Sequence, residues 1–405
     1  MQHRNRASLI ASSFAALLLI AAGCSGGDDS SADGQDGDGT GVESSADDSS
    51  TTDGSITDDE SSDQGGESES AEEGSEVEPE ESNDPTAVEP GTVVRLVTHD
   101  SFSVSDGLFD NFTLDTGIEV EVIKGGDAGE LVARAVLTAG DPEADVLFGI
   151  DNTFLQRGLD AELFLGYESP LLSVVPDELE LDPENRVTPI DFGDVCVNYW
   201  TENVVNPPTS LDDLTDPAFA ASFVTEDPES SSPGFAFLLA TIAEYGEDGW
   251  EDYWQQLRDG GVTVTPGWNE AYYGEFVAGG GDKALVTSYA SSPVAEVLFA
   301  AEPIDTAPTG VMADGCFRQI EFAGILSGTD VEAASRMLID FMLSDIFQSD
   351  IPLNMFVVPA STEVPLPELF VAHAAKVDNP LTLSPADIEA NRSDWTERWA
   401  EIVLR

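Results

Sequence analysis

The stretch TVVRLVTHDSF at residues 92–102 decides which class of fold the sequence predicts. Its first seven residues form a nearly continuous apolar and β-branched run, which is typical of a strand covered on both faces. A polar cluster at residues 99–102 follows at once. Ligands of open α/β sheets bind beyond the carboxyl ends of the strands, so His99 is a first candidate for a binding site.

The alternation continues along the chain. Residues 108–114 and 130–137 have helical spacing, and residues 118–123 and 144–152 are the next strand-like runs. A β-α-β-α-β order predicts a doubly wound parallel sheet. Asp127 stands just before the second helix, where its carboxylate could cap that helix, face a cleft, or do both.

The second half of the chain repeats the pattern. We expect a crossing segment at 187–193, strands at 195–200 and 284–289, and a strand at 321–326 that returns to the first half. An apolar helical face spans residues 334–347, and residues 351–359 lead from a loop into a strand. Residues 91–405 are enough for two lobes.

Two Ser-Ser-Pro segments, at residues 231–233 and 291–293, predict helix starts, with a serine hydroxyl as cap and a proline in the first turn. The second follows a strand that ends at Tyr289. Such helix starts are common structural devices, but a helix N-terminus with free hydroxyls also suits polar or anionic ligand atoms.

The aromatic segment TPGWNEAYYG at residues 265–274 has two interpretations. Trp268 and Tyr272, four residues apart, could pack one helical face into the core. Alternatively, the Pro-Gly break before Trp268 leaves one ring face open, and the ring becomes the wall of a pocket for a flat cation.

The N-terminus reads as a secretory signal. Arg4 and Arg6 precede an apolar run at 9–22 that is short for a membrane span, and Ala-Ala-Gly leads to Cys24. This arrangement resembles the bacterial lipoprotein box, in which Cys24 is lipidated; the alternative is an ordinary signal peptide with an incidental cysteine. Residues 25–90 carry 12 Asp and 11 Glu without Lys or Arg, which predicts a disordered, extended tether.

The amino-acid composition limits which classes of ligand the protein can bind. The whole chain has 79 acidic and 15 basic residues, a formal charge of −64, so nucleic acid is not expected. The acidity would attract a cationic solute, or it reflects a salty habitat. Cys196 and Cys316 are the cysteines left outside the membrane, and we expect them to form a disulfide. No paired Cys or His spacing predicts a metal site, and no cofactor is expected.

No catalytic motif accompanies these features. Five segments lie in an order and spacing that resembles the thiamine-binding lipoproteins of ABC importers: THDSF (98–102), GIDN (149–152), SSPG (231–234), VTVTPGWNEAY (262–272) and SYASSP (288–293). The similarity extends to the Ser-Pro-Ala at 384–386 and the terminal helix with its tryptophans, so it covers nearly the whole of residues 91–405.

The resemblance implies an α/β type II periplasmic-binding-protein fold, with two doubly wound lobes that close on thiamine or its mono- or diphosphate. It also implies a monomeric, non-enzymatic, lipid-anchored protein on the outer face of the cytoplasmic membrane (or in a periplasm) that delivers its ligand to a permease. The expected parts are signal 1–23, anchor and tether 24–90, first lobe 91–190, second lobe 191–315 and a return to the first lobe at 316–405.

The resemblance also implies a set of ligand contacts. The matching positions are Asp127, Ser231, Ser232, Trp268, Tyr289, Ser291, Ser292 and Pro293, to which we add His99 and Tyr272. The chain departs from the family at His99 and Ala295, where the family has Tyr, and around Met355 and Phe356, where it has Trp. These departures predict a thinner aromatic box.

Two alternatives remain at this point. Adjacent Tyr272 and Tyr273, together with His99, could imitate the tyrosine pair of ferric-iron-binding proteins. An extracellular enzyme on the same scaffold is the alternative from a different class of function.

Overall fold

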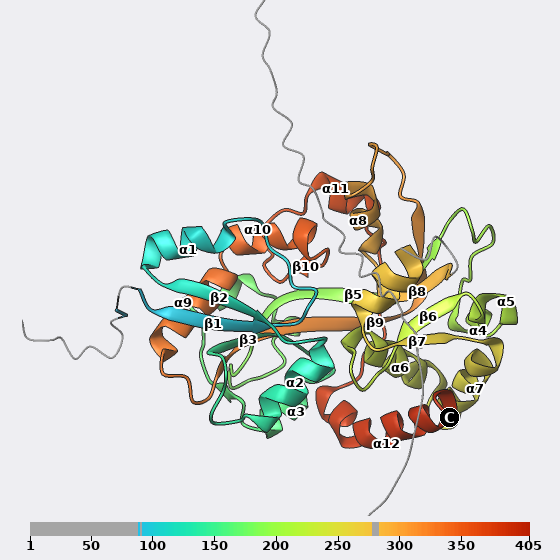
Figure 1. Cartoon of the computed structure of the whole chain (residues 1–405), viewed down its shortest axis with the longest axis horizontal. Helices are drawn as coiled ribbons and strands as arrows, with labels where there is room; N and C mark the ends of the chain where they lie inside the picture. The colour runs from blue at the N-terminus through green and yellow to red at the C-terminus, as the bar shows by residue number, and fades with distance from the viewer. Residues whose placement is uncertain (1–87, 90, 278–282) are drawn as a thin grey trace, which may run out of the picture. The chain divides into compact units, whose positions relative to one another are not determined.

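The computed structural model describes residues 88–89, 91–277 and 283–405 (Figure 1). The signal sequence, Cys24 and nearly all of the tether fall outside these residues, so these predictions stay untested by the structure. Within the described part, no helix has the length and apolar character needed to cross a membrane.

The described strands form one mixed sheet whose main path runs β2-β1-β3-β9-β5-β8-β6-β7. Short β4 pairs with β9, and β10 pairs with β5. The strands are β1 (Val93–Thr98), β2 (Glu119–Lys124), β3 (Val146–Asp151), β4 (Phe164–Leu165), β5 (Thr188–Trp200), β6 (Phe223–Glu226), β7 (Thr263–Thr265), β8 (Leu285–Tyr289), β9 (Thr309–Leu326) and β10 (Val358–Pro359).

Two parallel groups flank a central antiparallel pair. Strands β1, β2 and β3 are parallel to one another, and so are β6, β7 and β8. Between them lie β5 and β9, which pair antiparallel along most of their length. This arrangement confirms the predicted α/β fold with two lobes joined by crossing strands.

The crossing strands are longer than the sequence suggested. We expected separate segments at 187–193 and 195–200, but β5 is continuous and absorbs irregularities as shifts in register, between Pro189 and Asp191 and between Val195 and Val197. Likewise β9 extends the predicted strand at 321–326 back to Thr309. Pairing with several neighbours keeps such long strands continuous.

Helices cover both parallel groups (Figure 1). In chain order they are α1 (Leu108–Thr116), α2 (Ala128–Leu137), α3 (Leu155–Asp160), α4 (Leu211–Leu214), α5 (Pro217–Ala220), α6 (Ser232–Tyr245), α7 (Trp250–Gly260), α8 (Ser292–Leu298), α9 (Glu332–Met342), α10 (Asp345–Asn354), α11 (Glu368–His373) and α12 (Pro385–Val403). The other helical elements are the short 3₁₀ turns η1 (Leu172–Val174) and η2 (Asp177–Leu179) and the π-helix η3 (Glu270–Val277).

Helix α12 ties the two sides together, because it packs on α3 of one lobe and α7 of the other. Its buried Trp399 meets Trp254 of α7 edge to face, with ring centroids 5.4 Å apart. Trp395 donates to Glu247 Oε1 at 2.8 Å. Both tryptophans therefore pack α12 against the second lobe.

One region differs from its prediction. The apolar face at 334–347 belongs to two helices, α9 and α10, because Ser344 starts a second helix by accepting a hydrogen bond from the Phe347 amide at 3.5 Å. Residues 351–354, which we predicted as loop, continue α10. Pro352 and its neighbour Ile351 are both buried there, so tertiary packing outweighs the helix-breaking tendency of proline.

Candidate functional site

A cavity of about 330 Å³ lies where the two parallel groups face each other across β5 and β9. That volume is in the range of small-molecule sites. Its lining includes His99, Phe102, Lys124, Asp127, Ser232, Trp268, Asn269, Tyr272, Tyr273, Tyr289, Ser292, Ala295, Phe299, Gln319, Glu321, Met355 and Phe356. Seven of the ten predicted ligand contacts are in this group; Ser231, Ser291 and Pro293 are not.

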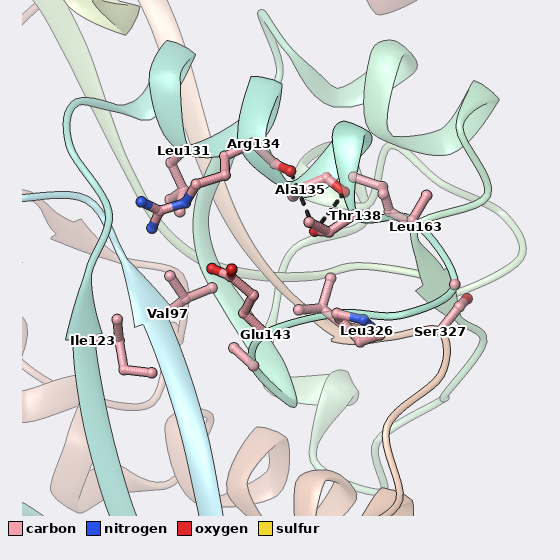
Figure 2. Close-up of a pocket in the computed structure, with 14 residues that line it drawn as sticks. Val97, Ile123, Leu131, Arg134, Ala135, Thr138, Glu143, Leu163, Leu326 and Ser327 are labelled. Carbon is pink, nitrogen blue, oxygen red and sulfur yellow. Dashed lines mark hydrogen bonds between the residues drawn. The ribbon is translucent and has the colours of Figure 1, made fainter. Parts of the chain in front are cut away.

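A second hollow lies on the first lobe alone. Figure 2 shows Arg134 and Glu143 among the aliphatic side chains that line it, such as Leu131 and Leu326. Its volume is about 60 Å³, well below that of a typical ligand site. The larger cavity is therefore the candidate site.

The aromatic segment forms one wall of the cavity, which we call the aromatic wall (Trp268, Tyr272 and Tyr273). The Trp268 ring stacks on Tyr272 with centroids 5.0 Å apart and planes 15° apart. Tyr272 is buried beneath it and donates its hydroxyl to Glu296 Oε1 at 2.9 Å, while Tyr273 meets both rings edge to face. Both interpretations of the segment hold in part, since Tyr272 packs in the interior and Trp268 also lines the cavity.

Polar contacts fix the Trp268 ring. Its indole Nε1 donates to Ser288 Oγ at 3.0 Å, and its backbone amide donates to Asp127 Oδ2 at 2.9 Å. Gly267 makes this approach possible, because a Cβ on it would lie only 2.9 Å from the same Asp127 oxygen. The Pro-Gly break thus lets a residue of the second lobe reach a carboxylate of the first.

Asp127 has both roles that its position suggested. Its Oδ1 accepts from the Ala128 amide at 2.7 Å at the start of α2, and the carboxylate lines the cavity. Burial raises its pKa, although the amides of Trp268 and Ala128 act in the opposite direction. The next turn is as tight, since the Gly129 amide donates to the Ser230 carbonyl at 3.1 Å.

The two Ser-Ser-Pro segments do not cap as predicted. Ser231 occupies the cap position of α6 without a side-chain capping bond, and Ser232 already lies in the first turn. Both hydroxyls are buried; that of Ser232 has no hydrogen-bond partner among the described residues, and that of Ser231 interacts with the Asp127 carboxylate. Proline at the start supplies the helical backbone angle by itself, so the hydroxyls are not needed as caps.

At the second segment the serines are engaged. Ser291 precedes α8 and donates its hydroxyl to the Phe356 carbonyl. Ser292 Oγ lies 2.8 Å from Ser288 Oγ and accepts from the Tyr289 amide at 3.1 Å. Ser292 lines the cavity, whereas Ser291 supports the loop that carries Phe356.

The floor of the cavity carries two residues that the sequence analysis missed, Gln319 and Glu321 of β9. Tyr289 donates its hydroxyl to Gln319 Oε1 at 3.0 Å, and His99 Nε2 lies 3.2 Å from Glu321 Oε1. Burial by itself lowers the pKa of His99, but the neighbouring Glu321 carboxylate outweighs it and the pKa is raised. The only signal in the sequence was an acidic residue ahead of an apolar run.

Charge in the cavity is mainly negative. Asp127 and Glu321 line it, and Lys124 is the single Lys or Arg among its lining residues. The Lys124 ammonium donates to the carbonyls of Asp100, at 2.8 Å, and Phe102, and burial lowers its pKa. A cation therefore fits this cavity better than an anion.

The sequence predicted fewer aromatic side chains near Ala295 and Met355 than the family has. Phenylalanines close the cavity on this side. Phe299 and Phe356 both line the cavity and meet edge to face, with centroids 5.7 Å apart. Phe356 has a φ of 58°, which is uncommon for a residue with a side chain. Phe356 was predicted only as a replacement for a family tryptophan, and Phe299 was not among the predicted contacts.

The predicted disulfide between Cys196 and Cys316 is present, with the sulfur atoms 2.07 Å apart. Across the described residues, no group of three or more His, Cys, Asp or Glu side chains is arranged to hold a metal ion. The Tyr272 hydroxyl, one of the three groups of the ferric alternative with Tyr273 and His99, is hydrogen-bonded to Glu296.

Comparisons with known proteins identify the family of the chain. Residues 141–382 match the family described as bacterial extracellular solute-binding protein. The thiamine-binding periplasmic protein of Escherichia coli (strain K12) is 30% identical over 319 residues, which are 77% of this chain and 94% of that protein. The corresponding protein of Brucella suis is 29% identical over 325 residues, 79% of this chain and 94% of its own length.

Solved structures give the same result. A structure named periplasmic thiamin binding protein superposes with a TM-score of 0.69 at 27% identity and covers 78% of this chain and 97% of its own. Iron-bound HitA from Pseudomonas aeruginosa superposes with a TM-score of 0.63 at 19% identity, over 77% of this chain and 99% of HitA, which shows a shared fold alone. The chain belongs to the bacterial extracellular solute-binding proteins and has a type II periplasmic-binding-protein fold.

Proposed function

We propose that this protein captures thiamine, or its mono- or diphosphate, outside the cell and delivers it to the permease of an ABC importer. The observation that carries the proposal is the Trp268 ring, held between Tyr272 and Ser288 on the wall of an acidic cavity. The relatives that are about 30% identical and named as thiamine-binding proteins support the same ligand.

The chemistry of thiamine matches this cavity. Thiamine is a permanent cation with two flat rings, so an aromatic face can stack on it and a carboxylate can balance its charge. A cation over an aromatic face contributes about 0.5–2 kcal/mol. Trp268 is the proposed stacking face, and Asp127 and Glu321 are the proposed acidic partners.

The other predicted contacts take more specific roles in this proposal. His99, Ser232, Tyr272, Tyr289 and Ser292 border the cavity and are proposed to contact the ligand or to hold the residues that do. Three predicted contacts stand behind this lining, namely Ser231, Ser291 and Pro293, and are proposed to support it.

The wider setting is part of the proposal too. We infer a signal peptide at 1–23, lipidation of Cys24, a tether to residue 90, and a monomer whose lobes (91–190 with 316–405, and 191–315) close on the ligand. Mass spectrometry of the mature protein tests the anchor, because a diacylglycerol mass on an N-terminal Cys24 peptide is expected.

Calorimetric titration with thiamine, thiamine monophosphate and thiamine diphosphate tests the ligand. We expect saturable binding to one site for at least one of the three, and no heat with any of them would contradict the proposal. Ferric iron added in parallel separates the iron alternative, since a tyrosinate–iron complex would give a visible absorbance band. Analysis of the phosphates after incubation would reveal hydrolysis by an enzyme.

A further inference from the structure

Three carboxyl side chains lie side by side beneath the cavity. The strand register pairs Glu321 of β9 with Asp151 of β3 on one side and with Asp191 of β5 on the other. Directly opposed residues of antiparallel strands have their side chains close together on one face. We call Asp151, Glu321 and Asp191 the carboxyl row; they are 0%, 7% and 1% exposed.

The row has few positive neighbours. His99, just after β1, meets Glu321, and from α12 the guanidinium of Arg392 lies near Asp151. Arg392 is largely committed elsewhere, because it stacks over Phe154 and Phe235 at 4.0 and 3.9 Å and donates to the Thr153 carbonyl. The other titratable residues that line the cavity with Glu321 and His99 are Asp100, Lys124, Asp127, Tyr272, Tyr273 and Tyr289.

Some carboxyl oxygens of the row also lack a hydrogen-bond donor. Asp151 Oδ1 accepts from the Thr153 amide at 2.7 Å and from its hydroxyl at 2.6 Å. Asp151 Oδ2 and Asp191 Oδ2 are buried and have no partner among the described residues. A buried carboxylate without donors is costly, so such a group keeps its proton at pH values where an exposed one has lost it.

The direction of the pKa shifts agrees with this geometry. Burial, more than any neighbour, raises the pKa of Asp151 to about 7. Burial, and then the Glu321 carboxylate opposite, raise the pKa of Asp191 well above its ordinary value. Because adjacent carboxyls are coupled, a charge placed beside one member of the row also changes how tightly its neighbours hold their protons.

The middle member of the row opens to the cavity. Glu321 lines it together with His99 and Gln319, whereas Asp151 and Asp191 lie on either side of Glu321 without lining the cavity. Building on the proposed function, we infer that the carboxyl row is the counter-charge for the ligand's cation, and that filling the cavity expels a proton from the row.

The sign of the effect follows from charge. A cation above Glu321 favours the ionised form of each carboxyl, so a proton leaves when the ligand binds, and binding tightens as the pH rises. The same cation disfavours protonated His99 and Lys124 and favours ionised Asp127, so these groups act in the same direction. Substitutions within the row are therefore needed to identify the source of the proton.

The test is calorimetric titration of the protein with thiamine between pH 6 and pH 8, in buffers of different ionisation enthalpy. The dependence of the observed heat on the buffer counts the protons released. We expect release of a substantial fraction of a proton near pH 7, and an affinity that rises by up to about tenfold per pH unit for each proton released.

Asp191→Asn tests the assignment to the row. Asparagine keeps the shape of the carboxyl group, supplies an N–H donor for Glu321 and cannot titrate. Asp151→Asn is the second variant, because its side-chain oxygen still accepts from Thr153. Each variant is expected to bind thiamine and to release about half as many protons as the unsubstituted protein. The double variant should release only the small remainder that comes from His99, Lys124 and Asp127.

The matched control is Asp182→Asn. Asp182 is also buried but bonds to Arg186, at 2.7 Å, outside the cavity lining. Its proton release on binding should equal that of the unsubstituted protein. Thiamine binding without proton release would overturn the inference, and so would proton release in the Asp191 and Asp151 variants that equals that of the unsubstituted protein. Absence of thiamine binding at every pH would instead contradict the proposed function.

Discussion

The aromatic wall and the carboxyl row lie on the same cavity but arise in opposite ways. The wall comes from residues 268–273 of one segment, and its members touch because they are near one another in the sequence. The row combines residues 151, 191 and 321, which only the pairing of three strands brings together. A local sequence pattern can thus supply ring stacking, whereas charge at the floor depends on the whole sheet.

The two regions should also contribute differently to binding. Stacking on the Trp268 ring involves no titrating group, so its contribution is nearly independent of pH. The row contributes charge, and its contribution depends on how many protons it holds. Substitutions in the wall should therefore lower affinity equally at every pH, whereas substitutions in the row should change how affinity depends on pH.

Glu321→Gln should have the largest effect on ligand affinity. The change removes the carboxylate that lines the cavity and leaves the shape of the side chain almost unchanged. Loss of one partner from a buried charge pair costs at least about 2 kcal/mol, equivalent to about thirtyfold weaker thiamine binding. Calorimetry at pH 8 measures it, and unchanged affinity would remove Glu321 from the site.

Trp268→Ala should weaken thiamine binding by at least about tenfold, because the stacking face and its burial are lost. The loss should be similar at pH 6 and pH 8. Trp268→Phe is the matched control, since it keeps a ring and should recover most of the affinity. Equal affinity for all three proteins would show that Trp268 serves only in packing.

Gly129→Ala should separate the wall from the first lobe. A Cβ there would lie 2.6 Å from the Ser230 carbonyl oxygen and 2.8 Å from that of Glu229. The backbones would have to move apart, which disturbs the contact between Asp127 and the wall and lowers affinity by about fivefold. Gly274→Ala is the control, because its Cβ would meet nothing within 4 Å. Equal affinities for the two variants would contradict the prediction.

Asp191→Asn should change stability in a way that depends on pH. The raised pKa of Asp191 means that the folded protein holds a proton that the unfolded chain releases. Asp191 therefore contributes full stability at low pH, and this is lost as the pH rises towards its folded-state pKa. We compare the melting temperature of the variant with that of the unsubstituted protein at each pH. The difference should shift in favour of the variant by about 2–4 °C between pH 5 and pH 8. The same difference at both pH values would contradict the prediction.

The comparison also explains what the sequence could and could not predict. Strand and helix order, Asp127 before α2, the Trp268 segment and the Cys196–Cys316 pair depend on local patterns, or on a resemblance, that are visible in the chain. Glu321 gave almost no signal, because its importance comes from its register with Asp151 and Asp191.

Other misses have the same origin. Ser231 was not distinguished from Ser232, since only the structure shows which one precedes the first helical residue of α6. Phe299 reaches the cavity through packing against Phe356, 57 residues later in the chain. Long-range packing decides these positions, and neither spacing nor propensity carries that information.

A thiamine titration of the unsubstituted protein, Trp268→Ala and Glu321→Gln under identical conditions at pH 8 tests the proposed site directly. We expect one thiamine per protein, and clearly weaker binding in both variants. Failure of the unsubstituted protein to bind thiamine or either phosphate, or binding that neither substitution weakens, would contradict the proposed site.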